Sequence, residues 1–142
     1  MGKVLIVAEH LDGKLNAATA KCVSAAQALK PDSIDIVVLA ADPAGVAAEA
    51  AQIAGVAKVL TVANAANANA IAQVQAPQVA ALAKGYTHVF GPSTTFGKDL
   101  MPAVAALLGV AQVSDVMAVE GSHAFKRPIY AGNAIVTVEA PA

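Results

Sequence analysis

Short runs of branched apolar residues alternate along this chain with alanine-rich segments, and this alternation constrains the fold more than any other feature. The runs span residues 4–8, 34–40, 59–62, 88–90 and 116–119. Because they are nearly continuous in apolar side chains, we expect both faces of each strand to be covered, which is typical of a parallel sheet. Strands separated by helices predict a three-layer, doubly wound α/β fold with about five parallel strands.

The alanine-rich segments carry helix signals. Asn16 can cap a helix that reaches about residue 29, and Pro43 suits the first turn of a helix that ends near Gly55. A third segment, residues 69–84, contains Pro77. Since proline removes a helical hydrogen bond, we expect Pro77 either to kink this segment or to divide it into a loop and a shorter helix that ends before residue 85, and we favour the division.

A fourth helix is expected to end at residue 108, before Gly109. Pro102 is tolerated only in a first turn, which places the expected start near Lys98 or Asp99. After residue 119 the pattern changes. Residues 125–130 and 133–139 are typical of strands around Ala131 and Gly132, and we expect them to add an antiparallel tail at one edge of the sheet.

Composition excludes several classes of function. Nine basic and ten acidic residues leave a net charge of -1, without the basic cluster that nucleic acids require. A single Cys22 allows no disulfide within the chain, and the three histidines lack metal-ligand spacing. Although 57% of the residues are hydrophobic, about a quarter are alanine. We expect no membrane span, no signal peptide, no metal site and a cytoplasmic protein.

Ligands of such sheets bind beyond the carboxyl ends of the strands where the strand order reverses, so the loops after the first and fourth strands are the candidate sites. The first loop, residues 9–13, lacks the G-x-G-x-x-G pattern of a dinucleotide site. Its Glu9 and Asp12 permit two interpretations, an acid/base pair or a solvated loop, and we favour the solvated loop.

The loop after the fourth strand, GPSTTFGKD at residues 91–99, nearly matches a phosphate-binding loop. A true loop has four residues between its glycines and Ser or Thr after the Lys, whereas here five intervene and Asp99 follows Lys98. Ser93 lies outside a G-x-S-x-G motif, so no nucleophile elbow is present. The hydroxyls are interpreted mainly as helix caps, with contact to an anion or a partner carboxylate as the alternative. No catalytic residue is predicted.

Two long blocks resemble the alpha subunit of electron transfer flavoproteins: THVFGPSTTFGKDLMPAVAALLGVAQVSDVMAVE and FKRPIYAGNAIVTVEAP. The opening VLIVAEHLDGKLNAAT and the middle AAQIAGVAKVL are also similar, so the resemblance covers essentially all 142 residues. It implies an adenine nucleotide alpha hydrolase-like fold. It also implies that residues 1–142 form only the amino-terminal domain, without the carboxyl-terminal domain that supplies most contacts to FAD.

The resemblance implies an electron carrier subunit rather than an enzyme with its own catalytic centre. The complete carrier is a heterodimer with a beta subunit. It accepts electrons from flavin dehydrogenases, such as the acyl-CoA dehydrogenase class in fatty acid oxidation, and passes them to a quinone oxidoreductase. FAD is its cofactor, and we expect these residues alone to bind none. The structural AMP of the beta subunit is not expected here.

The family pattern also indicates contact residues. Ala103 stands where that pattern usually has Arg, so any ion pair of that Arg is missing. The candidates for subunit or interdomain contact are Ser93, Thr94, Thr95, Phe96, Gly97, Lys98, Ser114, Asp115, Arg127, Tyr130 and Asn133. The alternative function is a stand-alone small-nucleotide-binding domain of the universal-stress-protein type.

Overall fold

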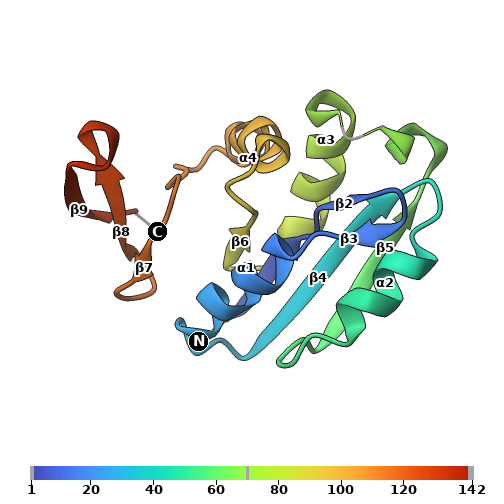
Figure 1. Ribbon diagram of the computed structural model, residues 1–142, viewed down its shortest axis with the longest axis horizontal. Coiled ribbons are helices and arrows are strands. Elements are labelled where there is room, and N and C mark those ends of the chain that lie inside the picture. Colours follow the sequence, from blue (N-terminus) through green and yellow to red (C-terminus); the bar gives the residue numbers. More distant parts are fainter. Residues whose placement is uncertain (1, 70, 141–142) are drawn as a thin grey trace.

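A four-stranded parallel sheet in the order β5-β4-β1-β6 forms the centre of the molecule (Figure 1). The computed structural model describes residues 2–69 and 71–140. The strands are β1 (Lys3–Val7), β4 (Ser33–Ala40), β5 (Lys58–Ala63) and β6 (His88–Phe90), and every neighbouring pair is parallel. The predicted three-layer α/β class is confirmed, although the sheet has four parallel strands rather than about five.

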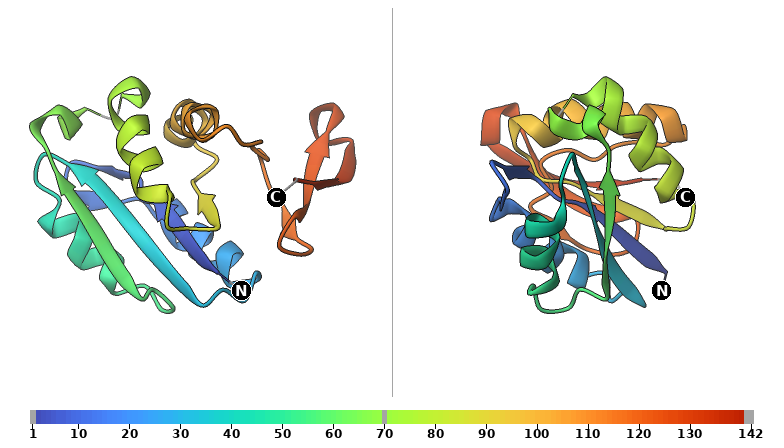
Figure 2. Two further views of the ribbon diagram at one scale, coloured as in Figure 1. Left: turned by 180° about the vertical axis from the view of Figure 1, so that it is seen from behind. Right: turned by 90° about the vertical axis from the view of Figure 1, so that its right-hand side faces the viewer.

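Helices cover both faces of this sheet (Figure 2). Side chains from α1 (Ala18–Gln27) and α2 (Ala44–Ala51) pack on one face, against Val4 and Ile6 of β1. Side chains from α3 (Ala72–Ala83) and α4 (Thr95–Leu108) pack on the other, against Leu5 and Val7. Successive residues of a strand point to opposite faces, so the continuous apolar run of β1 supplies both cores.

The strand order reverses between β1 and β6. From β1 the chain moves outward to β4 and β5, and then returns to place β6 on the other side of β1. The carboxyl ends of β1 and β6 therefore border the crevice at the topological switch point, where open α/β sheets bind ligands. The loops singled out from the sequence lie at this place.

Pro77 and Pro102 both lie inside helices, whereas we expected Pro77 to interrupt its helix and Pro102 to lie in a first turn. Pro77 does not divide its segment, because α3 runs unbroken through it, after a short 3₁₀ turn at Ala65–Ala68. Likewise α4 begins at Thr95 rather than near Lys98 or Asp99 and contains Pro102. Each proline frees the carbonyl four residues earlier, at residues 73 and 98, and both of these residues are exposed. Water can satisfy the freed carbonyls, while buried positions of the same helices hold them on the sheet.

The start of α1 and the end of α4 follow the sequence more closely, whereas the end of α2 does not. Asn16 accepts a hydrogen bond from the Ala18 backbone N–H at 2.8 Å, as expected of a residue at the start of α1. Gly109 ends α4 in a left-handed conformation with φ of 68°. α2 ends at Ala51, four residues short of Gly55. The loop after β1 folds into a small hairpin of β2 (His10–Leu11) and β3 (Lys14–Leu15).

The carboxyl-terminal strands form a sheet of their own, here called the tail sheet. It consists of β7 (Ala118–Val119), β8 (Ala124–Ile129) and β9 (Ala134–Glu139), all antiparallel, with a 3₁₀ turn at Tyr130–Gly132. Of the expected fifth parallel strand, residues 116–119, only Ala118 and Val119 form a strand, which is β7 of this sheet. The next strand in sequence is β8. Because the turn between β7 and β8 is short, antiparallel pairing of these two strands has a low entropy cost of loop closure.

The tail sheet also does not extend the parallel sheet by hydrogen bonding, as the predicted antiparallel edge would. Among the described residues the two sheets are separate. The tail sheet lies beside β6 and α4, and Phe125 is its buried side chain (Figure 1). In the described part of the chain, every helix is too short or too polar to cross a membrane.

Candidate functional site

The switch point is bridged by one hydrogen bond between the two loops that border it. The Thr94 hydroxyl, after β6, donates to Glu9 Oε1, after β1, at 2.8 Å. The same Thr94 oxygen accepts the backbone N–H of Gly97 at 3.3 Å and so caps α4. The predicted capping interpretation is confirmed for Thr94, and its hydroxyl also bonds a carboxylate 85 residues away.

Further bonds fix the loop that carries Glu9. Its backbone N–H donates to the hydroxyl of buried Thr19 at 3.3 Å, and its carbonyl accepts the N–H of Asn16 at 2.8 Å. The next side chain, His10, contacts the Leu39 carbonyl through Nε2 at 2.8 Å. Glu9 is half-buried and hydrogen-bonded to Thr94, so the favoured interpretation of this loop as solvated does not describe the Glu9 side chain.

This arrangement does not fit a phosphate or pyrophosphate group. A phosphate site needs free N–H donors and positive charge, as at an open helix start. Here the start of α4 is capped by Thr94, whose hydroxyl is committed to the carboxylate of Glu9. A bound anion would face the negative charge of Glu9. The negative charge of Glu9 at the switch point therefore disfavours the pyrophosphate of FAD or a nucleotide phosphate there.

The remaining residues at the start of α4 divide by exposure. Ser93 and Thr95 are exposed, and Phe96 is half-buried and packs against the core beneath α3 and α4. Gly97 is buried, and a Cβ placed on it would collide with the Pro92 carbonyl oxygen. Only glycine lets the first turn of α4 approach the preceding loop this closely.

Four of the predicted contact residues are linked between α4 and the tail sheet. Lys98 Nζ lies 3.9 Å from Asp115 Oδ1. Next to Asp115, the Ser114 carbonyl accepts a hydrogen bond from Arg127 Nε at 2.9 Å, and the Ser114 hydroxyl accepts one from the guanidinium at 3.4 Å. Arg127 is thus a clamp between β8 and the segment that follows α4.

Tyr130 and Asn133 lie elsewhere, at the tip of the β8–β9 hairpin. Tyr130 is 77% exposed. Tyr130 and Ala131 have φ of 52° and 54°, the left-handed region that costs a side-chain-bearing residue roughly 1–2 kcal/mol. The structure therefore separates the eleven predicted contact residues into the start of α4, the Arg127 clamp and this hairpin tip. Their role in binding stays a prediction.

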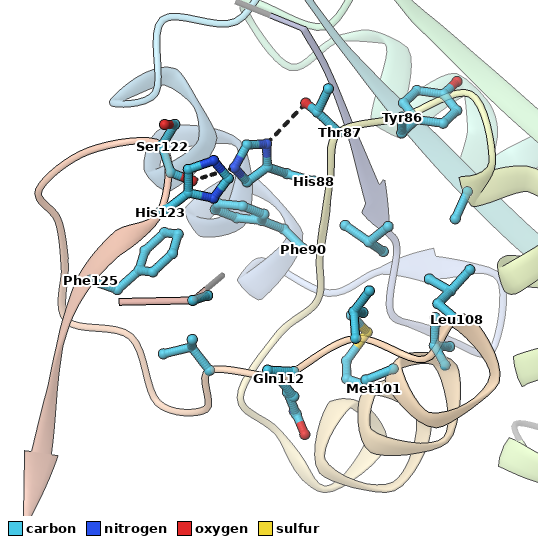
Figure 3. Close-up of a pocket in the computed structure, with 18 of the residues that line it drawn as sticks. Tyr86, Thr87, His88, Phe90, Met101, Leu108, Gln112, Ser122, His123 and Phe125 are labelled. Atoms are coloured by element: carbon cyan, nitrogen blue, oxygen red, sulfur yellow. Dashed lines mark hydrogen bonds between the residues drawn. The ribbon is translucent and has the colours of Figure 1, made fainter. Parts of the chain in front are cut away.

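A cavity of about 400 Å³ lies between β6, α4 and the tail sheet, and no sequence pattern predicts it (Figure 3). At one end His88 Nε2 contacts the Ser122 carbonyl at 2.6 Å and Nδ1 contacts the Thr87 hydroxyl at 2.9 Å. The His123 ring lies 6.1 Å from the His88 ring. The partners are 34 residues apart in sequence, so no local pattern could reveal this contact.

The buried carboxylate of Asp35 and its half-buried partner Tyr86 were also missed, although the sequence held a signal for Asp35. Asp35 interrupts the apolar run of β4 and is only 1% exposed. The Tyr86 hydroxyl donates to its Oδ2 at 2.5 Å, while Oδ1 has no hydrogen-bond partner among the described residues. Burial, and then the bond to Asp35, raise the pKa of Tyr86 to about 12.

Cys22 and the histidines bear on redox and metal chemistry. Burial raises the pKa of the Cys22 thiol to about 11, and the nearby charge of Glu9 adds to the shift. Within residues 2–69 and 71–140, no three His, Cys, Asp or Glu side chains come together as metal ligands would.

Comparison with known proteins gives consistent results. Residues 4–142 match the family described as "Electron transfer flavoprotein domain". Electron transfer flavoprotein subunit alpha of Pseudomonas aeruginosa is 48% identical over 98% of this chain and 45% of its own length. The same subunit of Paracoccus denitrificans is 46% identical over 96% of this chain and 44% of its own length. The mitochondrial alpha subunit of Dictyostelium discoideum is 34% identical over 95% of this chain and 40% of its own length. The chain therefore spans less than half the length of these relatives.

Proposed function

Because this chain belongs to the electron transfer flavoprotein domain family, we propose that it is the amino-terminal domain of an alpha subunit, acting as scaffold and docking surface. The similarity to three alpha subunits over nearly the whole chain supports this. The observation that carries the docking role is the closed switch point. Glu9 and Thr94 bond each other where related folds hold a ligand, which leaves the outer surface for function.

In the proposed complete carrier, this domain pairs with a beta subunit and with the rest of the alpha subunit. FAD is held mainly outside residues 1–142, and these residues contain no catalytic centre. The carrier accepts electrons from flavin dehydrogenases of the acyl-CoA dehydrogenase class and delivers them to a quinone oxidoreductase. We place it in the cytoplasm. The anion-repelling carboxylate of Glu9 supports the assignment of FAD to other residues.

Docking can be tested by titrating the chain with the beta subunit of Pseudomonas aeruginosa in a calorimeter. We expect binding, and we expect Tyr130→Ala to weaken it at least about tenfold, because exposed aromatic side chains are common anchors of interfaces. Leu11→Ala is the matched control, since Leu11 is also 77% exposed but lies on the β2–β3 hairpin. Absence of binding by the unaltered chain would overturn the docking role.

Two ligand titrations test the remaining parts of the proposal. Mixed with FAD and then gel-filtered, the chain should elute without stoichiometric flavin colour. Calorimetry with AMP, ADP and ATP should show no heat, whereas micromolar binding corresponds to about −8 kcal/mol and is easily measured. Tight FAD binding would refute the placement of the flavin site. Tight nucleotide binding would instead favour the universal-stress-protein alternative.

A further inference from the structure

The two edges of the parallel sheet differ in how they meet solvent. β5 begins with Lys58, and lysine is a residue that natural proteins place on edge strands to prevent further pairing. β6, with the sequence HVF, contains neither Lys nor Pro. It pairs with β1 on one side, and no described strand pairs with its other side. The outer edge of β6 is therefore unpaired and lacks the usual protection.

The cavity of about 400 Å³ runs along this outer edge (Figure 3). Met101, Val104 and Leu108 of α4 line one wall, and Phe125 of the tail sheet lines another. Among the described residues that line the cavity, Lys84 is the only one of the types Lys, Arg, Asp and Glu. A cavity lined in this way suits apolar side chains. Adjacent strands of a sheet are about 4.8 Å apart, so a strand paired with β6 would direct side chains into the cavity.

The tail sheet borders this space without closing the edge. His88 Nε2 contacts the Ser122 carbonyl at 2.6 Å, at one end of the cavity. In the described chain, no backbone hydrogen bond joins β6 to the tail sheet. The tail sheet therefore stands as a wall opposite β6, with the cavity between the two.

We propose that the outer edge of β6 and the adjoining cavity form a docking site for one further β-strand of uncharged, mainly apolar side chains. Its source is the polypeptide that the alpha subunits carry outside the matched region, which is more than half of their length. The proposal rests on the proposed place of this chain within such a subunit. The added strand pairs with the backbone of residues 88–90, and its side chains fill the cavity against α4 and Phe125.

The test fuses the 142-residue chain, through a flexible Gly/Ser linker, to a strand of alternating Val and Thr. A flexible linker gives an effective concentration near millimolar, enough to detect weak strand addition. The matched control has Pro at the centre of the added strand, which removes a donor and disfavours pairing. Amide hydrogen exchange is measured by NMR in both fusions at His88 and Phe90, whose N–H groups face away from β1 because the Thr87 N–H bonds the Lys3 carbonyl. The β5 amides are the internal reference.

We expect exchange at the β6 edge to slow about tenfold or more in the Val/Thr fusion relative to the Pro fusion, with β5 unchanged. Equal rates in the two fusions would overturn the proposal. So would protection of the His88 and Phe90 amides in the unfused chain, which would mean that the tail sheet covers the edge. Protection that grows with the concentration of unfused chain would assign the edge to a second copy. No step uses FAD or the beta subunit, so this result is independent of the tests of the proposed function.

Discussion

Among single residues, Asp35 and Tyr86 form a contact to which the stability of the fold should be sensitive. The Asp35 carboxylate is buried in the central sheet, and one of its oxygens has no hydrogen-bond partner among the described residues. Lys58 Nζ lies 3.9 Å from the bonded oxygen, but its side chain is largely exposed, so the attraction is weak. The Tyr86 hydroxyl at 2.5 Å is the close partner. A buried polar group that loses its partner is destabilising, which makes this bond a sensitive point of the fold.

We expect Tyr86→Phe to lower the free energy of unfolding by about 1–3 kcal/mol, the range for leaving a buried polar group unsatisfied. Urea denaturation would show a lower midpoint with an unchanged slope. Tyr130→Phe is the control and should have no effect, since Tyr130 is 77% exposed. Equal midpoints for Tyr86→Phe and the unaltered chain would contradict the assigned role.

The same tyrosine predicts a loss of stability in alkali. Its pKa in the folded protein is raised from 10 to about 12, so its contribution is fully present below pH 10 and is lost as the pH rises through about 12. Between these values, the unaltered chain should lose stability more steeply than Tyr86→Phe. Unfolding free energies measured from pH 8 to 12 would check this, and parallel curves would refute it.

Cys22 should react slowly with thiol reagents in the folded chain. Its pKa of about 11, against the model-compound value of 9.0, reduces the thiolate at pH 8 by about 100-fold. Alkylation by iodoacetamide, followed by mass spectrometry, should be at least this much slower before than after denaturation. Comparable rates in both states would show that burial does not protect the thiol.

At the scale of the elements, the junction between β6 and α4 is held by packing and by capping, and each can be tested separately. Gly97 brings the first turn of α4 against the Pro92 carbonyl, and Thr94 ties that turn to the loop after β1. These contacts explain why α4 begins earlier than Pro102 alone would suggest.

Gly97→Ala should therefore be strongly destabilising, by about 1–3 kcal/mol or more, because its Cβ would displace backbone rather than a flexible side chain. Gly85→Ala is the matched control, since a Cβ there meets nothing within 4 Å and its φ is not positive. Thermal unfolding of both variants gives the comparison. A Gly97→Ala chain as stable as Gly85→Ala would disprove the close approach.

Thr94→Val should cost about 1–2 kcal/mol, because it removes a helix cap together with the bond to Glu9. Thr94→Ser keeps the hydroxyl and should restore most of this stability. A double-mutant cycle with Glu9→Gln should show a coupling of at least about 0.5 kcal/mol. Additive effects in urea denaturation would mean that the two loops are not linked.

The sequence predicted the four parallel strands, the number of large helices and the position of the switch point, because these depend on local apolar patterns and turn residues. It failed where a distant contact or solvent decided the outcome. Pro77 is tolerated because the carbonyl it frees belongs to an exposed residue, and that requires knowing which side of α3 meets the sheet. Likewise, the sequence placed the loops of Glu9 and Thr94 at one crevice but could not show the hydrogen bond between them. Residues 116–119 resemble a buried strand wherever they pair.

The molecule as a whole combines two sheets that differ in how much apolar surface they bury. The parallel sheet has two apolar cores, one on each face, whereas the tail sheet has one buried side chain, Phe125. Its described polar links to the rest include the Arg127 clamp and the contact between His88 and Ser122. The proposed contact residues Arg127, Tyr130 and Asn133 belong to this less firmly held part.

We therefore expect the tail sheet to open before the rest of the molecule. Native-state hydrogen exchange in low urea should show the amides of β8 and β9 exchanging by a local opening, while those of β1 and β4 exchange only by global unfolding. Arg127→Ala should accelerate exchange in β8, and Lys126→Ala, which alters the exposed pair with Glu120, should not. A single opening free energy for both sheets would contradict this division.

The central position of β1 has a consequence for biosynthesis. β1 leaves the ribosome before the other described strands, and its neighbour β6 follows more than eighty residues later. At roughly 5–20 residues per second, one side of an almost wholly apolar strand waits for several seconds without its partner. During that interval β1 is a target for chaperones and for misfolding on the nascent chain, so the speed of translation between α1 and β6 should influence the yield of folded protein.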